Sequence, residues 1–193
     1  TPMDDGQRLE FYPIRSTRPT PTDLLSLADA KAHLRVDVTA EDDLITDLIG
    51  AALDTCQQVT GRYLGSTSAT LYADGWKNQA FTFGPVTAIS KVEYYNQANT
   101  LTELPAARWW ADLESTPQRI TFDAPPAIYT NRHQGVKVSA TLGEGTIPRP
   151  MRQAALLLVG HYYENRQQVV TGSKPEAIPM AVDFLLNPFR VWP

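Results

Sequence analysis

The stretch TAEDDLITDLIGAALDTCQQVTG, residues 39–61, decides the fold of this 193-residue chain. Its apolar residues recur every three or four positions, the spacing that places side chains on one face of an α-helix. They are Leu44, Ile45, Leu48, Ile49, Ala52, Leu53 and Cys56. Thr39 and Asp42 resemble a capping box, and Gly61 is a typical C-terminal stop. The spacing predicts one long helix over about residues 40–61, whose apolar face requires a partner.

A second long helix is predicted over about residues 150–168, because Pro150 suits the first turn of a helix. Residues 154–159 are apolar on every face, which is typical of a central helix packed on both sides. Gly160 costs about 1 kcal/mol relative to alanine inside a helix. We expect this cost to be tolerated because another helix, the one at 40–61, crosses closely there.

Two short helices accompany the long ones. Residues 26–29 resemble a capping box that opens a helix near 27–36. Pro179 is placed to begin a last helix over about 179–186. Together the four segments predict a small α-helical bundle.

The chain between residues 67 and 145 has a different character. Its segments are short, rich in β-branched and aromatic residues, and separated by Gly, Pro and Asn turns. They read TLYAD, AFTFG, ISKVEYY, RWWADL, QRITF and VKVSATL. This pattern predicts an antiparallel β-subdomain inserted into the helical bundle, so the expected fold class is α+β.

The same patterns divide the chain into parts. Residues 24–66 and 146–187 are expected to form the helical core, with 67–145 as the inserted β-subdomain. Residues 1–23 are rich in proline and lack apolar periodicity, so we interpret them as an extended arm. Residues 188–193 form an apolar and aromatic C-terminal tail.

Composition excludes several classes of function. The formal net charge is −4 and the basic residues are scattered, which argues against a general nucleic-acid-binding surface. Cys56 is the only cysteine, which excludes an internal disulfide and zinc sites that need two thiolates from one chain. The longest apolar run, 154–160, is too short to span a bilayer, and the polar N-terminus does not resemble a signal peptide. We therefore expect a soluble protein.

The best catalytic candidate is the pair His161 and Glu164, because residues three apart share a helix face. A helix-bundle carboxylate metal site needs Glu-x-x-His twice, with further glutamates from other helices. Here the order is reversed and the motif occurs once. We interpret the pair as the polar end of a buried helix and expect no catalytic, cofactor-binding or metal site. An enzyme centred on this pair is the weaker alternative function.

A cluster of aromatic residues gives the other alternative. Trp76, Tyr94, Tyr95, Trp109 and Trp110 could form a platform for a sugar or a base. In a small β-subdomain, such residues more often fill the core or a protein–protein contact. A small binding module built on this aromatic β-subdomain is therefore kept as the alternative to an assembly protein.

Several short phrases point to a family. They are Leu27-x-x-Ala-Lys-x-His-Leu-Arg35, Asp42-Asp-Leu-Ile45, Gly61-Arg62-x-Leu64, Tyr163-Glu-Asn-Arg166 and Leu185-Leu-x-Pro-x-Arg190. In this order the chain resembles the head–tail connector (adaptor) proteins of tailed bacteriophages and gene transfer agents. Gly84-Pro85-Val86 at the start of a strand is similar to the variant with a β insertion. The resemblance spans about residues 24–191.

The resemblance implies a structural protein without enzymatic activity. Such proteins assemble into a ring, usually a dodecamer, beneath the portal of the DNA-filled head. The ring extends the DNA channel, contacts DNA without sequence specificity, and offers a docking surface to the stopper or tail-completion protein. The implied location is the head–tail joint of a virion made in the host cytoplasm, with no membrane partner and no cofactor.

The resemblance also implies two sets of interaction residues. Terminal segments in this family commonly grip the portal, and Trp and Arg are residue types that anchor interfaces energetically. The candidate portal-docking residues are Phe189, Arg190, Val191 and Trp192. The candidates for contacts between helices or between subunits are Arg35, Arg62, Tyr163, Glu164 and Arg166.

Overall fold

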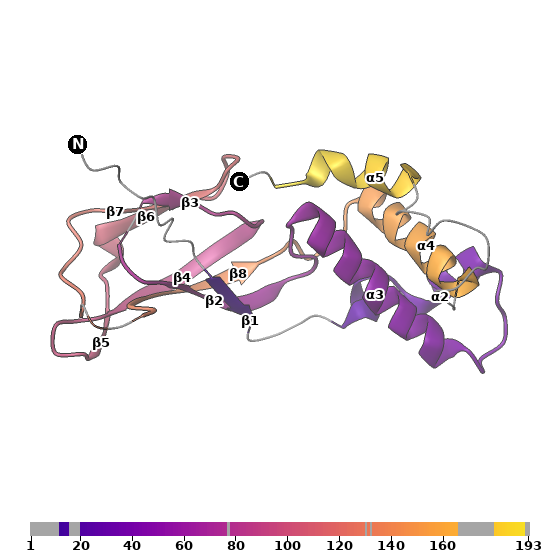
Figure 1. Ribbon diagram of the computed structural model, residues 1–193, viewed down its shortest axis with the longest axis horizontal. Coiled ribbons are helices and arrows are strands. Elements are labelled where there is room, and N and C mark those ends of the chain that lie inside the picture. Colours follow the sequence, from indigo (N-terminus) through magenta and orange to yellow (C-terminus); the bar gives the residue numbers. More distant parts are fainter. Residues whose placement is uncertain are drawn as a thin grey trace. The chain divides into compact units, whose positions relative to one another are not determined.

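The computed structural model describes residues 12–15, 20–76, 78–129, 131, 133–165 and 180–191, which fall into two compact units (Figure 1). The helical unit contains residues 19–66 and 144–192, and the β unit contains residues 67–143 together with the first strand. The α+β class predicted from the sequence is confirmed. Each unit has its own buried side chains and is described by itself.

The helical unit is built from α-helices and one short 3₁₀ helix. Their bounds are α1 Pro21–Leu24, α2 Leu27–Leu34, α3 Asp42–Thr60, α4 Arg149–Glu164, α5 Met180–Leu186 and the 3₁₀ helix η2 Asn187–Phe189. Within the described residues, no helix is long and apolar enough to cross a membrane. The helix bounds match the predicted bundle of two long and two short helices, with α1 as an additional turn.

Helix α3 ends as predicted but begins differently. Gly61 adopts a left-handed conformation with φ of 68°, and its N–H bonds the Gln57 carbonyl at 2.9 Å. The capping box expected at Thr39 does not form, and among the described residues Glu41 precedes the helix without a side-chain cap. Glu41 instead accepts a hydrogen bond from Tyr163 of α4, so a long-range contact shapes this end.

Helix α2 begins as the sequence predicts. The Ser26 hydroxyl oxygen accepts the Asp29 N–H at 3.1 Å, which caps the first turn. The same hydroxyl donates to the Asp29 carboxylate at 2.6 Å, and Arg152 of α4 lies 2.6 Å from that carboxylate. The Ser26 hydrogen bond, followed by the Arg152 contact, holds the pKa of Asp29 below its usual value. A local cap thus also joins α2 to α4.

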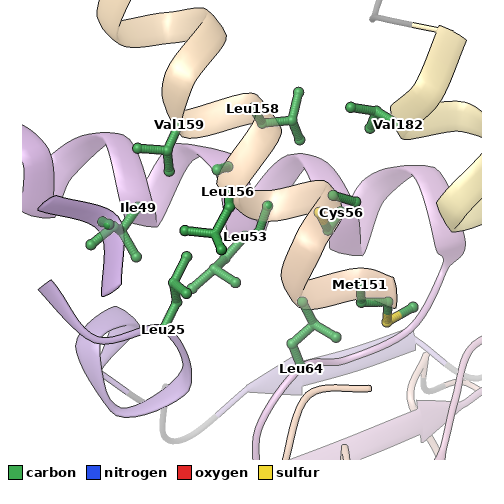
Figure 2. Close-up of a cluster of buried hydrophobic side chains, with 14 of the residues drawn as sticks. Leu25, Ile49, Leu53, Cys56, Leu64, Met151, Leu156, Leu158, Val159 and Val182 are labelled. Atoms are coloured by element: carbon green, nitrogen blue, oxygen red, sulfur yellow. The ribbon is translucent and has the colours of Figure 1, made fainter. Parts of the chain in front are cut away.

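The core of the helical unit lies where α3, α4 and α5 face one another (Figure 2). Its buried side chains include most of those predicted on the apolar stripe of α3, with Leu44 and Leu48 only partly buried, and most of the apolar run of α4. Figure 2 labels Ile49, Leu53, Cys56, Met151, Leu156, Leu158, Val159 and Val182 among them. Burial raises the pKa of the Cys56 thiol to about 12, which favours the protonated thiol.

Two expectations for α4 are corrected. The helix ends at Glu164, and Asn165 leaves helical geometry, with φ −109° and ψ 63°; the rest of the predicted extension to about residue 168 lies outside the described residues. The neighbour of Gly160 is not α3: a methyl group there would lie 3.6 Å from Nε2 of His33, on α2. That distance is ordinary van der Waals contact, so glycine is not required for close packing.

The β unit contains two antiparallel sheets among the described residues. One has five strands in the order β1-β2-β8-β4-β5 and the other has three in the order β3-β7-β6. The strands are β1 Tyr12–Arg15, β2 Thr67–Ala73, β3 Gln79–Ala80, β4 Val86–Tyr95, β5 Leu101–Glu103, β6 Trp109–Asp112, β7 Arg119–Phe122 and β8 Val136–Leu142. A short 3₁₀ helix, Ala106–Arg108, precedes β6.

Strand β8 is central and carries the predicted alternation. Val136, Val138, Ala140 and Leu142 are buried, whereas the residues between them are partly exposed. This strand pairs with β2 on one side and β4 on the other. The alternation of apolar residues in this segment of the sequence thus matches its burial in the sheet.

The N-terminal segment departs from the extended arm expected over residues 1–23. Tyr12–Arg15 pairs with β2 as an edge strand, with Pro13 opposite Leu71 and Arg15 opposite Ala69. Pro21–Leu24 forms a short helix. Without β1, strand β2 would present unpaired backbone groups at the edge of the sheet, which pairing with β1 covers.

Two glycine substitutions should change stability in opposite directions. Gly160→Ala should stabilise the chain by up to about 1 kcal/mol, because alanine is the better helix former and its methyl group has room. Gly61→Ala should destabilise it by about 1 kcal/mol, because φ of 68° is unfavourable for a side chain. Urea denaturation of both variants measures the two effects. A loss of stability in Gly160→Ala would contradict the contact described with His33.

Candidate interaction surfaces

The His161–Glu164 stretch closes helix α4. The side-chain amide of Asn165 donates to the His161 carbonyl at 2.9 Å and lies 3.3 Å from its Nδ1. The imidazole ring also lies 6.0 Å from the Tyr162 ring, and Glu164 is exposed. Within the described ranges, no group of three or more His, Cys, Asp or Glu is placed to hold a metal ion. The geometry supports the polar end of a buried helix.

The tyrosines of this stretch hold α4 against α3. The Tyr163 hydroxyl donates to the Glu41 carboxylate at 2.5 Å, at the start of α3. The Tyr162 hydroxyl lies 3.0 Å from Oγ1 of Thr55, in the second half of the same helix. Both bonds join residues more than a hundred positions apart. Polar contacts therefore fix the register of the two long helices.

The arginine candidates have different surroundings. Arg62 pairs with Glu144 at 3.4 Å, beside a parallel backbone bridge between Leu64 and Glu144. Arg35 ends α2 in a left-handed conformation, and its side chain is exposed. Arg166 and Trp192 lie outside the described residues. Arg62 is thus engaged within the chain, and Arg35 is available to a partner.

The C-terminal candidates are tied to the helical unit. Phe189 packs partly buried against its core, and Arg190 lies 3.3 Å from Asp183 of α5. The Val191 N–H donates to the Thr60 carbonyl at 2.8 Å, at the last turn of α3. The described part of the tail is therefore fixed at the C-terminal end of α3.

Large apolar side chains are exposed in both units. In the helical unit they are Met180 and Phe184 on α5, 89% and 81% exposed, and Val38 in the α2–α3 loop, 58% exposed. In the β unit they are Trp110 and Leu101, 55% and 40% exposed. The sequence did not single out Met180, Phe184 or Val38. Contiguous exposed apolar surface is typical of a protein–protein contact.

The five aromatic residues singled out from the sequence do not form one platform. Trp76 contacts Tyr94, with ring centroids 5.4 Å apart. Tyr95 lies elsewhere, with the Lys137 ammonium 5.2 Å from its ring centroid. Trp109–Trp110 lies on β6 of the smaller sheet. Trp109 lies opposite Phe122 of β7, whose ring centroid is 5.0 Å from that of Trp76, whereas the ring of Tyr95 faces Lys137.

The ends of the long helices are fixed by contacts within the chain, and several large apolar side chains are exposed. Such exposed apolar side chains are typical of a protein that assembles with others. The family model for head completion proteins matches residues 23–190, and the chain belongs to that family. This confirms the resemblance to head–tail connector proteins. No curated protein matches the chain.

Solved structures share the fold. One, from the neck of an empty GTA particle computed with C6 symmetry, has a TM-score of 0.72 at 22% identity. A second, from the virion of a native gene transfer agent particle, has a TM-score of 0.73 at 21% identity. A third, from the neck of a native GTA particle computed with C12 symmetry, has a TM-score of 0.72 at 20% identity. All three matches cover 94% of this chain and 96% of the other.

The bond between α4 and the start of α3 gives a stability prediction. Tyr163→Phe should lower the free energy of unfolding by about 1–2 kcal/mol, because the Glu41 carboxylate loses a donor. A double-mutant cycle with Glu41→Gln should give a coupling of about 1 kcal/mol or more. The matched control is Tyr162→Phe. The Tyr162 hydroxyl contacts Thr55 and not Glu41, so this substitution should couple to Glu41→Gln much more weakly. Equal coupling in both cycles would contradict the assignment.

Proposed function

We propose that this protein is the head–tail adaptor of a tailed phage or gene transfer agent and forms a ring beneath the portal. The observation that carries the proposal is the family match over residues 23–190, together with a shared fold in GTA necks computed with C6 and C12 symmetry. A dodecamer is compatible with both symmetries. The role is structural, and it is exercised in the virion neck.

The ring would extend the DNA channel and carry the docking surface for the stopper or tail-completion protein. A net charge of −4 suits a channel through which DNA slides, because tight phosphate binding requires cationic contacts. Arg35 and Glu164 are exposed and are assigned to contacts between subunits. Tyr163 and Arg62 are assigned to contacts within the subunit, since each has a partner there. Arg166 is assigned to the subunit contacts by the family resemblance alone.

Electron microscopy of purified particles tests the ring. With the wild-type chain, we expect closed rings at the joint between head and tail, in register with the portal. Particles made without the chain should retain DNA-filled or empty heads but lack attached tails. Finding the chain absent from the neck, or present there without ring symmetry, would contradict the proposal.

The tail residues Phe189, Arg190, Val191 and Trp192 are assigned to portal docking. The first three lie next to the C-terminal end of α3, which fixes the point from which Trp192 continues. Deleting residues 187–193 would also remove the Phe189 packing and the Val191 bond to Thr60. A substitution at Trp192 is therefore the cleaner test.

Trp192→Ala should weaken binding to isolated portal rings about tenfold or more, because tryptophan is the residue type that most often anchors interfaces. Trp110→Ala, which removes an exposed tryptophan of the β unit, is the matched control and should leave portal binding unchanged. Circular dichroism checks that both variants are folded. Undiminished portal binding by Trp192→Ala and by a chain ending at Val191 would contradict docking through the tail.

A further inference from the structure

Helix α5 is apolar on the side that faces away from the helical core. Val182 and Leu186 are buried and attach the helix to the unit. Met180 and Phe184 are four positions apart and therefore lie on one face, which is almost fully exposed. Asp183 lies beside them, and its half-exposed carboxylate is 3.3 Å from the Arg190 guanidinium of the same chain. We call Met180, Asp183 and Phe184 the α5 surface.

The α2–α3 loop exposes a complementary set of side chains. Val38 is 58% exposed, and Arg35 is exposed next to it. The loop is held in place, because the Lys31 ammonium donates to the Val38 carbonyl at 2.9 Å and pairs with Asp42 at 2.5 Å. Arg35 has φ 59° and ψ 41°, a conformation that is unfavourable for a residue with a side chain. We call Arg35 and Val38 the loop surface.

The two surfaces lie on different elements of the helical unit. Val38 precedes the start of α3 at Asp42, whereas the segment after α5 bonds the last residue of α3, Thr60. The helix has 19 residues and is therefore about 28 Å long. In Figure 1 the segment that follows α5 lies near the C-terminal end of α3, and the connection from α2 reaches the other end.

We infer that the two surfaces meet between neighbouring copies of the chain. Val38 of one copy packs between Met180 and Phe184 of the next. Arg35 of the first copy pairs with Asp183 of the second. The inference rests on the proposed ring, and it assigns the subunit contact within it.

Symmetry and charge favour a second copy as the occupant. A closed ring requires each subunit to offer two different surfaces, because a contact of one surface with itself closes at the dimer. Surfaces on two different elements of the same helical unit meet this requirement. The guanidinium of Arg35 and the carboxylate of Asp183 are of opposite charge, and each borders apolar side chains. Met, Phe and Arg are residue types that are enriched at interfaces, so these side chains are suited to anchor a larger contact.

Cross-linking in assembled necks tests the contact directly. In particles carrying Val38→Cys with Phe184→Cys, a short thiol-specific cross-linker should give a ladder of oligomers on a denaturing gel. Either single variant should give no ladder, because each copy then offers only one of the two thiols. Cys56 is fully buried and gives no background. Dimers from Phe184→Cys alone would mean that α5 contacts itself, which would overturn the inference.

A charge placed in the contact gives a second test. Phe184→Asp should lower the yield of closed rings at least about tenfold, because an unpaired carboxylate would be buried between copies. Gln153→Asp adds the same charge at an exposed position of α4 and should leave the yield unchanged. Circular dichroism checks that Phe184→Asp is folded, as expected for a side chain that is 81% exposed.

The outcomes separate this inference from the proposed function. Three results together would overturn the head-to-tail contact and leave the adaptor role standing. The wild-type chain would form rings, the double variant Val38→Cys with Phe184→Cys would give no ladder, and Phe184→Asp would form normal rings. Loss of portal or stopper attachment with intact rings would mean that the α5 surface contacts another protein, which also overturns it. Absence of wild-type rings from the neck would contradict the proposed function itself.

Discussion

The contact between α3 and α4 is the constraint on which the helical unit depends. Ile45, Ile49 and Cys56 of α3 and Ala154 and Val159 of α4 have no exposed surface. The two helices lie about a hundred residues apart in the chain. Strands β2 to β8 lie between them in sequence, so the chain leaves the helical unit after α3 and returns to it before α4. Their packing therefore requires that both ends of the insertion lie close together.

The first and last residues of the insertion are paired with each other, and so are the residues that flank it in the helical unit. Thr67 lies opposite Leu142 in the five-stranded sheet, and Leu64 forms a backbone bridge with Glu144 in the helical unit. The Arg62–Glu144 ion pair adds a contact beside that bridge. Because its entry and exit strands are paired, the β unit can fold around its own core without disturbing the helices.

The sequence predicted the features that depend on local pattern. The apolar period of α3, the Ser26 cap of α2 and the alternation of β8 are set by residues near one another in the chain. It failed where a distant residue decides. Glu41 ends up before α3 with Tyr163 as its partner, and Gly160 faces His33 and not α3. No spacing rule reports such contacts.

The exposed apolar residues of α5 also could not be predicted from local sequence pattern. Residues 180–186 read MAVDFLL, and apolar character alone does not say which side chains are buried. Packing against the core selects Val182 and Leu186, which leaves Met180 and Phe184 exposed. Once burial is known, the excess of exposed apolar surface becomes informative, because a solvated helix face of a monomer would be polar. A chain whose helix ends are fixed by Tyr162 and Tyr163 can carry such surfaces on a rigid frame. Two different surfaces on one rigid frame are what repeated head-to-tail contact requires, since small errors in angle would accumulate around a ring.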